Sequence, residues 1–403
     1  MATCPSCGHM QARYLLSLEG GPVTVASAFP SAEMARAVAG GPVELLGCTA
    51  CGLLYNEAFD PALAAASGLY ESSQAASAHF NAFSKELAAG WVERHGLRGQ
   101  HIVEVGFGGG DFIVDMLKAG CASATGIDPL AAHAVFDAQW LSRVKVEASC
   151  FEAPHTRLPA AALVCRHSLE HIADVRPFLT RVAQWSRHNG GAPVLFEVPA
   201  AERIIDECAF WDIFYEHCNY FSLASLRHAF EGAGLEVFDL RAAYGQQYLL
   251  VDARARAGDA PPARPPQAND AQPWIASCVA FAEQAQLTID RCRAHLSALA
   301  GDPGGVVIWQ GASKTVGLVT AIGESVPLRF AVDQNTGRHG KFLPPNGMLV
   351  APPESLREAR PSHVVLMNPV YFAEVRAQLD NMGLAGARLH TIDSLAASAA
   401  SRA

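Results

Sequence analysis

The stretch His101-Ile-Val-Glu-Val-Gly-Phe-Gly-Gly-Gly-Asp111 decides the fold of this chain. An apolar run leads into three alternate glycines, and Phe112, Met116 and Leu117 follow at helical spacing. The pattern predicts a strand, a tight loop and a helix. Glycine lets the backbone turn sharply and lets a ligand lie against it, and the first turn of the helix carries a partial positive charge.

An acidic residue stands where a nucleoside site requires one. Asp128 follows Gly106 by 22 residues and ends a second apolar segment, Ala124-Thr-Gly-Ile-Asp128. A carboxylate at that distance can accept hydrogen bonds from the two hydroxyls of a ribose. Together the strand, glycine loop, helix and spaced acid predict a nucleoside-cofactor site; the alternative is a glycine loop that serves only close packing.

The glycine spacing indicates which cofactor. Dinucleotide sites use G-x-G-x-x-G, whereas this chain has Glu-x-Gly-x-Gly-x-Gly with Glu104 two residues before Gly106, and a carboxylate there suits a cationic amine better than a phosphate. A nicotinamide-dependent oxidoreductase is therefore disfavoured. The motif resembles motif I of class I S-adenosylmethionine-dependent methyltransferases. The resemblance implies cofactor contacts from Glu104, Gly106, Phe107, Gly108, Gly110, Asp128, Pro129, Phe151 in the adenine segment, His167 after the fourth strand, and Tyr70, whose alternative role is packing between modules.

Composition limits the class of protein. A chain of 403 residues should hold two or three domains, and with half of its residues apolar and 17% charged it is globular. A net charge of −9 argues against a nucleic-acid or anionic-membrane partner. No charged and apolar leader opens the chain and no apolar run is long enough to span a membrane, so we expect a soluble cytoplasmic protein.

Four of the eleven cysteines form two CxxC knuckles. Each knuckle presents two thiolates from one tight turn, with a glycine after the second cysteine, so the pair can build a closed tetrahedral site for structural Zn²⁺. The alternatives are redox dithiols or incidental cysteines. We expect a zinc-binding module over residues 1–68, with short strands at Val23–Val25 and Val43–Leu46. The four ligands would be Cys4, Cys7, Cys48 and Cys51.

Residues 69–255 alternate apolar strands with helical patterns, which predicts a doubly wound, Rossmann-like α/β domain. A helix over 80–95 should lead into it. Predicted strands are 101–105, 123–127, 162–166, 193–198, 235–240 and 247–253.

Aromatic residues, carboxylates and a histidine gather in Trp211–Ser222, after the strand that ends at Pro199. Active sites of this fold lie at the carboxyl ends of the strands, and histidine exchanges protons near neutral pH. His217 is therefore the candidate base, with Glu216 and Tyr215 as candidates to orient it or the substrate. The alternative is a structural histidine.

A proline-rich linker is predicted at 256–273, followed by a long helix over 274–299 and a second, C-terminal α/β unit within 274–403. It is expected to begin with a strand, a turn and a helix over Gly304–Gly317, followed by strands near 328–332, 347–350 and 363–367, with helices near 315, 354 and 372. Lys314, Arg338 and Lys341 could help its first turn to hold an anion, or could be ordinary surface charge.

The order of these parts resembles the sugar C-methyltransferases that act on nucleotide-linked keto-deoxysugars. The resemblance is carried by Phe196-Glu-Val-Pro199, Glu216-His217, Gly311-Ala-Ser-Lys314 and Asp333-Gln-Asn335. It implies that His217 removes a proton beside a ketone, that the enolate attacks the sulfonium methyl, and that the C-terminal domain holds the nucleotide. Departures from the family pattern occur at Phe214-Tyr215 and at Tyr244-Gly-Gln-Gln247.

Those departures keep other functions open. One is an O- or N-methyltransferase of another small natural-product metabolite, and another is a nucleoside-binding scaffold without catalysis. The residues do not identify the acceptor, the atom that is methylated or the oligomeric state.

Overall fold

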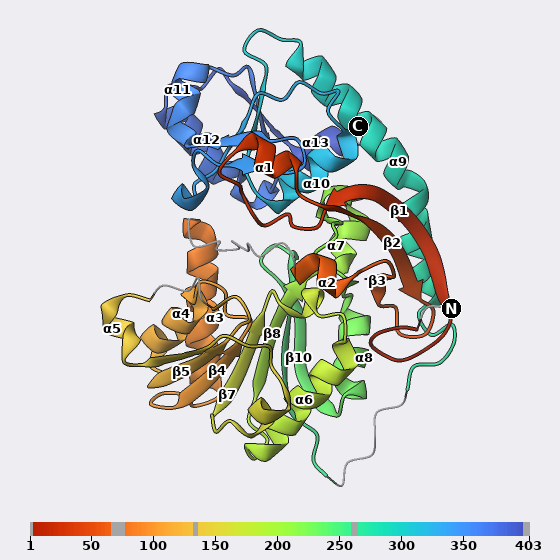
Figure 1. Cartoon of the computed structure of the whole chain (residues 1–403), viewed down its shortest axis with the longest axis vertical. Helices are drawn as coiled ribbons and strands as arrows, with labels where there is room; N and C mark the ends of the chain where they lie inside the picture. The colour runs from red at the N-terminus through yellow and green to blue at the C-terminus, as the bar shows by residue number, and fades with distance from the viewer. Residues whose placement is uncertain (1–2, 66–76, 132–135, 259–264, 398–403) are drawn as a thin grey trace.

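A computed structural model describes residues 3–65, 77–131, 136–258 and 265–397. Two lobes face each other in Figure 1, the central domain below and the C-terminal domain above, and β1 (Ala12–Pro22) and α9 (Gln272–Ala300) run side by side along one edge of both. The described helices are not long and apolar enough to cross a membrane.

The central domain is built on one mixed sheet. Its strands are β4 (His101–Val105), β5 (Ser123–Ile127), β6 (Val144–Glu147), β7 (Ala162–Arg166), β8 (Val194–Pro199), β10 (Leu235–Ala243) and β11 (Tyr248–Ala255). They lie in the order β10-β11-β8-β7-β4-β5-β6, and only β11 is antiparallel to its neighbours. The six predicted strands are all present, and β6 was not predicted. The doubly wound class is confirmed.

Helices cover both faces of this sheet, which is why its central strands β4, β7 and β8 are largely apolar and buried. On one face Ile102 packs with side chains of α3 (Ala78–Arg94) and α4 (Asp111–Ala119). On the other, Val103 packs with α6 (Val175–His188) and α8 (Leu223–Gly232). The smaller helices are α2 (Pro61–Ala65), α5 (Ala138–Leu141) and α7 (Ala201–Asp206).

The N-terminal module is completed by a strand from the central domain. Its sheet has the order β1-β2-β3-β9, where β2 is Gly40–Cys48, β3 is Leu54–Asn56 and β9 is Asn219–Tyr220. The expected strand at Val43–Leu46 is confirmed within β2. The one expected at Val23–Val25 is wrong: the chain leaves the sheet after Pro22 and crosses to the C-terminal domain, where Phe29 pairs with Phe342.

That crossing segment includes α1 (Ala32–Arg36), so the module and the C-terminal domain share an interface. The C-terminal sheet has the order β14-β15-β13-β12-β16-β17, which makes this domain a second α/β unit as expected. Its elements are β12 (Val306–Trp309), β13 (Ala331–Val332), β14 (Phe342–Leu343), β15 (Met348–Ala351), β16 (His363–Leu366), β17 (Arg388–Thr391), α10 (Ser313–Ile322), α11 (Leu356–Ala359), α12 (Phe372–Asn381) and α13 (Ile392–Ala396).

Gly317 lets α10 approach the central domain closely. A Cβ atom at this position would lie 2.3 Å from the carbonyl oxygen of Trp211. We expect Gly317→Ala to lower the free energy of unfolding by about 1–3 kcal/mol, because the two backbones must move apart. Gly90, exposed in α3, is the control, since a methyl group added there would meet no atom within 4 Å, and Gly90→Ala should stabilise by about 0.5–1 kcal/mol. Chemical denaturation measures both, and equal effects would contradict the close approach.

Candidate functional site

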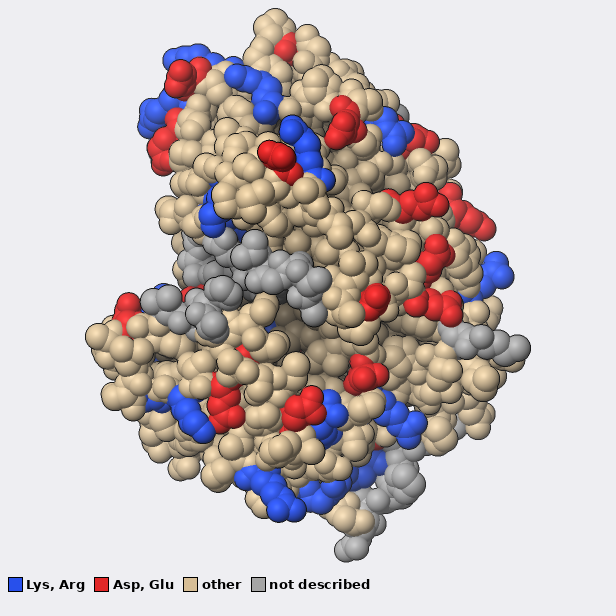
Figure 2. All heavy atoms as spheres, viewed as in Figure 1, with Lys and Arg blue, Asp and Glu red and all other residues tan. Residues whose placement is uncertain are grey.

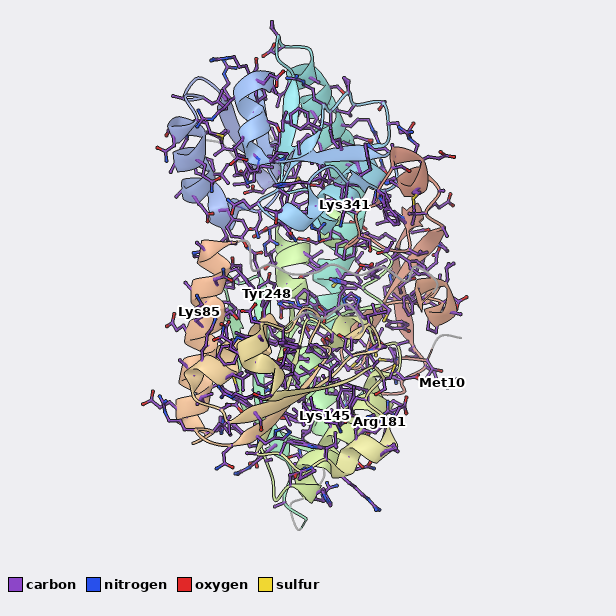
Figure 3. All side chains as sticks on the ribbon, turned by 60° about the vertical axis from the view of Figure 1, so that its left-hand side comes forward. Met10, Lys85, Lys145, Arg181, Tyr248 and Lys341 are labelled. Atoms are coloured by element: carbon purple, nitrogen blue, oxygen red, sulfur yellow. The ribbon has the colours of Figure 1, made fainter. Side chains whose placement is uncertain are left out.

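A cavity of about 840 Å³ lies between the central domain, the crossing segment of the N-terminal module and the C-terminal domain. Figure 2 shows a hollow in the surface between the two lobes, with positive and negative side chains interspersed around it. The glycine loop after β4 and the segment around His217 line the same cavity. Figure 3 shows Tyr248 on the central domain at the level where the C-terminal lobe, which carries Lys341, faces it.

The glycine loop supplies one wall of the cavity. Gly106, Phe107 and Gly108 all line it, whereas Gly110 does not: Gly110 starts α4 in a left-handed conformation against the ring of Phe136. Glu104 is buried, and its Oε2 has no hydrogen-bond partner among the described residues. Burial raises the pKa of Glu104 to about 8, so this carboxyl group is suited to a cationic ligand group.

The loop after β5 closes over the glycines. Asp128 accepts hydrogen bonds from the amides of Gly108 at 3.0 Å and Leu130 at 2.8 Å, which holds its carboxylate at the cavity wall. Pro129 and the buried ring of Phe151 line the same region. These side chains leave a space in which a nucleoside can lie between an acid and an aromatic ring.

Behind the loop lies a buried charge network at the ends of β7 and β8. Arg166 donates to Glu197 at 3.0 Å, and His167 Nε2 lies 2.7 Å from Glu197 Oε1. Burial alone would raise the pKa of Glu197, but Arg166 and His167 lower it to about 2. His167 has a φ of 49°, and its ring lies 4.6 Å from that of Tyr248 on the cavity wall.

His217 lies in the cavity wall with its ring 4.4 Å from that of Phe214 and 4.8 Å from that of His171. Burial, with the neighbouring histidines His171 and His167, holds the pKa of His217 well below its usual value. Its imidazole is therefore neutral and able to accept a proton at neutral pH.

Glu216 faces the N-terminal module. Burial raises the pKa of Glu216 to about 7, although hydrogen bonds from the Thr24 hydroxyl and from the amides of Val25 and Ala26 lower it. The crossing segment of the module thereby reaches the cavity, and it anchors the residue directly before His217.

Besides Gly110, one more sequence-predicted residue, Tyr215, is not among the described residues that line the cavity. Tyr215 is fully buried in the N-terminal module, where its ring packs on Phe59 and its hydroxyl accepts a hydrogen bond from the Asp60 amide at 2.8 Å. Glu216 and His217, which follow Tyr215, both line the cavity, whereas the Tyr215 side chain packs into the module. Its position gives no support to an orienting role. Tyr70 lies outside the described residues.

The four knuckle cysteines come together as predicted. Sγ of Cys4 lies 3.6 Å from that of Cys51, and Sγ of Cys7 lies 3.6 Å from that of Cys48. Zinc–sulfur bonds of about 2.3 Å in a tetrahedron put sulfurs about 3.8 Å apart, so the cluster fits one zinc ion. The glycines after the knuckles, Gly8 and Gly52, both have a φ of 78°. The geometry is that of four free thiols around one centre.

Lys314 and Arg338 are not ordinary surface charges, because both line the cavity and are held by other parts of the chain. Lys314 is an ion-pair partner of Asp212 from the central domain, and Arg338 donates to the carbonyl oxygens of Gly311 and Ala26. Both side chains thus join domains. Gln247, in one of the segments that depart from the family pattern, forms two hydrogen bonds with Asn368 across the cavity rim, at 2.8 and 3.0 Å.

The fold and the site together define a class I methyltransferase architecture, and comparisons with known proteins agree. A model described as a methyltransferase domain matches residues 72–240, and one described as a C-methyltransferase C-terminal domain matches residues 274–392. The chain is an S-adenosylmethionine-dependent methyltransferase. Its two matched domains place it in the C-methyltransferase family that the sequence motifs resemble.

One curated relative and many solved structures are similar to the chain. It is 28% identical over 351 residues to the C-methyltransferase NovU of Streptomyces niveus, in a match that spans 83% of this chain and 82% of that protein. A 1,6-didemethyltoxoflavin-N1-methyltransferase of Burkholderia thailandensis is 18% identical, with a TM-score of 0.33 over 43% of this chain and 79% of that one. Magnesium protoporphyrin IX methyltransferase of Synechocystis PCC 6803 is 12% identical, with a TM-score of 0.35 over 44% and 84%. Because these scores are low, the assignment rests on the family models and the site.

Sequence reasoning missed several cavity residues. Glu170 and His171 lie in the short helix η3 (Leu169–His171) after β7, and the sequence placed them only in the loop that follows the fourth strand. The sequence contained a signal for them, because these two ionisable residues follow a buried strand at the edge of the sheet where the glycine loop lies. Gln247 and Asn368 could not be paired from sequence, because they are 121 residues apart.

Proposed function

We propose that this methyltransferase adds a methyl group to a carbon beside the ketone of a nucleotide-linked keto-deoxysugar. One observation supports this most: a neutral, buried histidine, His217, lines the same cavity as the glycine loop and Asp128. A hydroxyl or amine acceptor has a lone pair that can attack before its proton leaves, whereas a carbon beside a ketone becomes nucleophilic only after its proton is removed. A carbon acceptor therefore requires a base, which this cavity contains. The family resemblance supports a sugar of natural-product biosynthesis as the acceptor.

S-adenosylmethionine supplies an electrophilic methyl group on its sulfonium sulfur. In the proposed reaction a nitrogen of His217 takes the proton from the carbon beside the ketone. The electron pair left on that carbon forms the new carbon–carbon bond, while the methyl–sulfur bond breaks and its electrons stay on sulfur. Glu216, fixed by the N-terminal module, positions the backbone that carries the base. A positioned base contributes about 10²–10⁴-fold to such a step.

The proposed contacts to S-adenosylmethionine use the wall formed by β4, β5 and β7. Glu104 would take the amino group, Asp128 the ribose hydroxyls and Phe151 the adenine, and the C-terminal wall would hold the nucleotide of the acceptor. The four-cysteine cluster would hold structural zinc, and no step of the reaction passes through it.

Product analysis tests the function. Incubation with S-adenosylmethionine labelled with carbon-13 in the methyl group, and with a set of nucleotide-linked ketosugars, should yield a methyl signal coupled to a ring carbon in the NMR spectrum. A methoxy or N-methyl signal would favour the alternative of an oxygen or nitrogen acceptor. Tight cofactor binding without turnover of any acceptor would favour the scaffold.

Asp128→Ala should weaken the binding of S-adenosylmethionine about 10- to 100-fold, because hydrogen bonds to a charged group contribute about 1.5–3 kcal/mol. Isothermal titration calorimetry with S-adenosylmethionine and with its demethylated product measures the loss, and NADH is the control ligand. Asp290→Ala, exposed on α9, is the control variant. Binding of NADH in place of the sulfur nucleosides would contradict the assignment.

The affinity for S-adenosylmethionine should also depend on Glu104. With a pKa of about 8, this carboxyl group is protonated at pH 7, and a cationic amine against it must expel the proton. Affinity should therefore rise with pH between about pH 6 and pH 7, by up to about tenfold per unit. Calorimetry in two buffers of different ionisation enthalpy should detect the released proton. In Glu104→Gln both effects should vanish, and a proton release that persists there would exclude Glu104 as its source.

A further inference from the structure

Three side chains outside the cysteine cluster meet at one point of the cavity wall. One carboxylate oxygen of Glu170 and one ring nitrogen each of His171 and His217 lie within 4.8 Å of one another. Bonds from zinc to nitrogen or carboxylate oxygen measure about 2.0–2.2 Å, so the ligand atoms of one tetrahedral ion lie about 3.4 Å apart. Side-chain rotations that move these atoms by about an ångström would bring all three onto a single ion.

The backbone segments that carry the three residues are locked together. Cys218 Sγ donates to the carbonyl oxygen of Glu170 at 3.4 Å, and Asn219 donates to that of Ile172 at 2.8 Å. His171 Nδ1 lies 2.9 Å from the Glu216 carbonyl oxygen. A carbonyl oxygen only accepts, so Nδ1 carries the hydrogen and Nε2 the lone pair. Metal-binding histidines are commonly oriented in this way.

An independent observation concerns Glu170 itself. Its side chain is only 2% exposed, and Oε2 has no hydrogen-bond partner among the described residues. Oε1 lies 3.9 Å from His167 Nδ1, which is longer than a hydrogen bond. A buried carboxylate oxygen without a partner costs free energy, and a cation between Glu170 and the two imidazoles would supply the missing interaction.

We propose that Glu170, His171 and His217 form a second, exchangeable site for a divalent cation. Two imidazoles and one carboxylate select zinc, cobalt or nickel rather than magnesium or calcium, and three protein ligands leave a position for water. The ion and the acceptor's proton compete for the same lone pair of His217. Occupation of the site therefore switches the enzyme off, a consequence that rests on the proposed role of His217 as base.

Cobalt is the probe for the site itself. The enzyme is first loaded with zinc at the cysteine cluster and freed of loosely bound metal, and Co²⁺ is then titrated. We expect saturable visible d–d absorption without a thiolate-to-cobalt band, and an affinity at least about tenfold weaker in Glu170→Gln. Glu374→Gln, a carboxylate on the C-terminal wall of the cavity, should bind cobalt as the wild type does. Retained binding of S-adenosylmethionine shows that each variant is folded.

Two results would overturn the site: no saturable absorption, or equal cobalt affinity in Glu170→Gln. Methyl-transfer rates then test the inhibition, which at saturating Zn²⁺ should reach at least about tenfold in the wild type and require a higher zinc concentration in Glu170→Gln. If cobalt binds but bound zinc leaves the rate unchanged, the site stands and the role of His217 as base falls. If His217→Ala is inactive and no cobalt binds, the base stands and the site falls.

Discussion

His217→Ala should slow methyl transfer about 10²–10⁴-fold, the contribution of a positioned general base, while binding of S-adenosylmethionine stays within about twofold. His217 lines the cavity, and alanine removes its proton acceptor while the glycine loop keeps its sequence. Single-turnover experiments with enzyme in excess of acceptor measure the chemical step directly. They separate it from product release, which limits the turnover of many enzymes.

The pH profile sharpens this test. The pKa of His217 lies well below its usual value, so the imidazole stays neutral as the pH falls through that usual value, and its protonation should not slow the wild type there. His188→Ala, exposed at the end of α6, is the matched control and should react at the wild-type rate. A His217→Ala enzyme that transfers methyl groups as fast as the control would remove the base from the mechanism.

Removal of metal from the four-cysteine cluster should unfold the N-terminal module and abolish activity. Structural zinc contributes about 10–16 kcal/mol of apparent binding free energy in small domains, more than such a module can recover from packing. The loss should reach the active site, because β3 pairs with β9, directly after His217, and the crossing segment holds Glu216. Cys48→Ser should have the same effect as a strong chelator.

Metal analysis should find one zinc per chain in the wild type, and circular dichroism during chelation should follow the loss of the module. Cys150→Ser is the control, because Cys150 is exposed and far from the cluster in sequence, and it should leave metal content and melting temperature unchanged. If the wild-type protein contains no metal and Cys48→Ser keeps the wild-type melting temperature, the cysteines pack as ordinary buried thiols.

Local patterns predicted most of the fold. The strand at 101–105 and the helix over 80–95 agree with β4 and α3 to within two residues at each end, because apolar periodicity and end signals lie within the segment itself. The unpredicted β6 alternates apolar and polar residues as a strand does, but it is only 4 residues long and none of them is buried, so its pattern does not stand out. Val23–Val25 was predicted as a strand because it contains apolar β-branched residues, but it forms none. Its apolar side chains are buried in an interface between domains instead.

The sequence by itself determined the cofactor loop, the spaced Asp128, the four cysteines and the segment around His217 that follows the strand ending at Pro199. Each of these depends on residues close together in the chain or on a spacing that the backbone imposes. Only the tertiary structure decided that Glu216 meets Val25 and Ala26, that Tyr215 turns into the module, and that Glu170 and His171 approach His217. Such pairings depend on how separate segments pack, and no local pattern records the register of one segment against another.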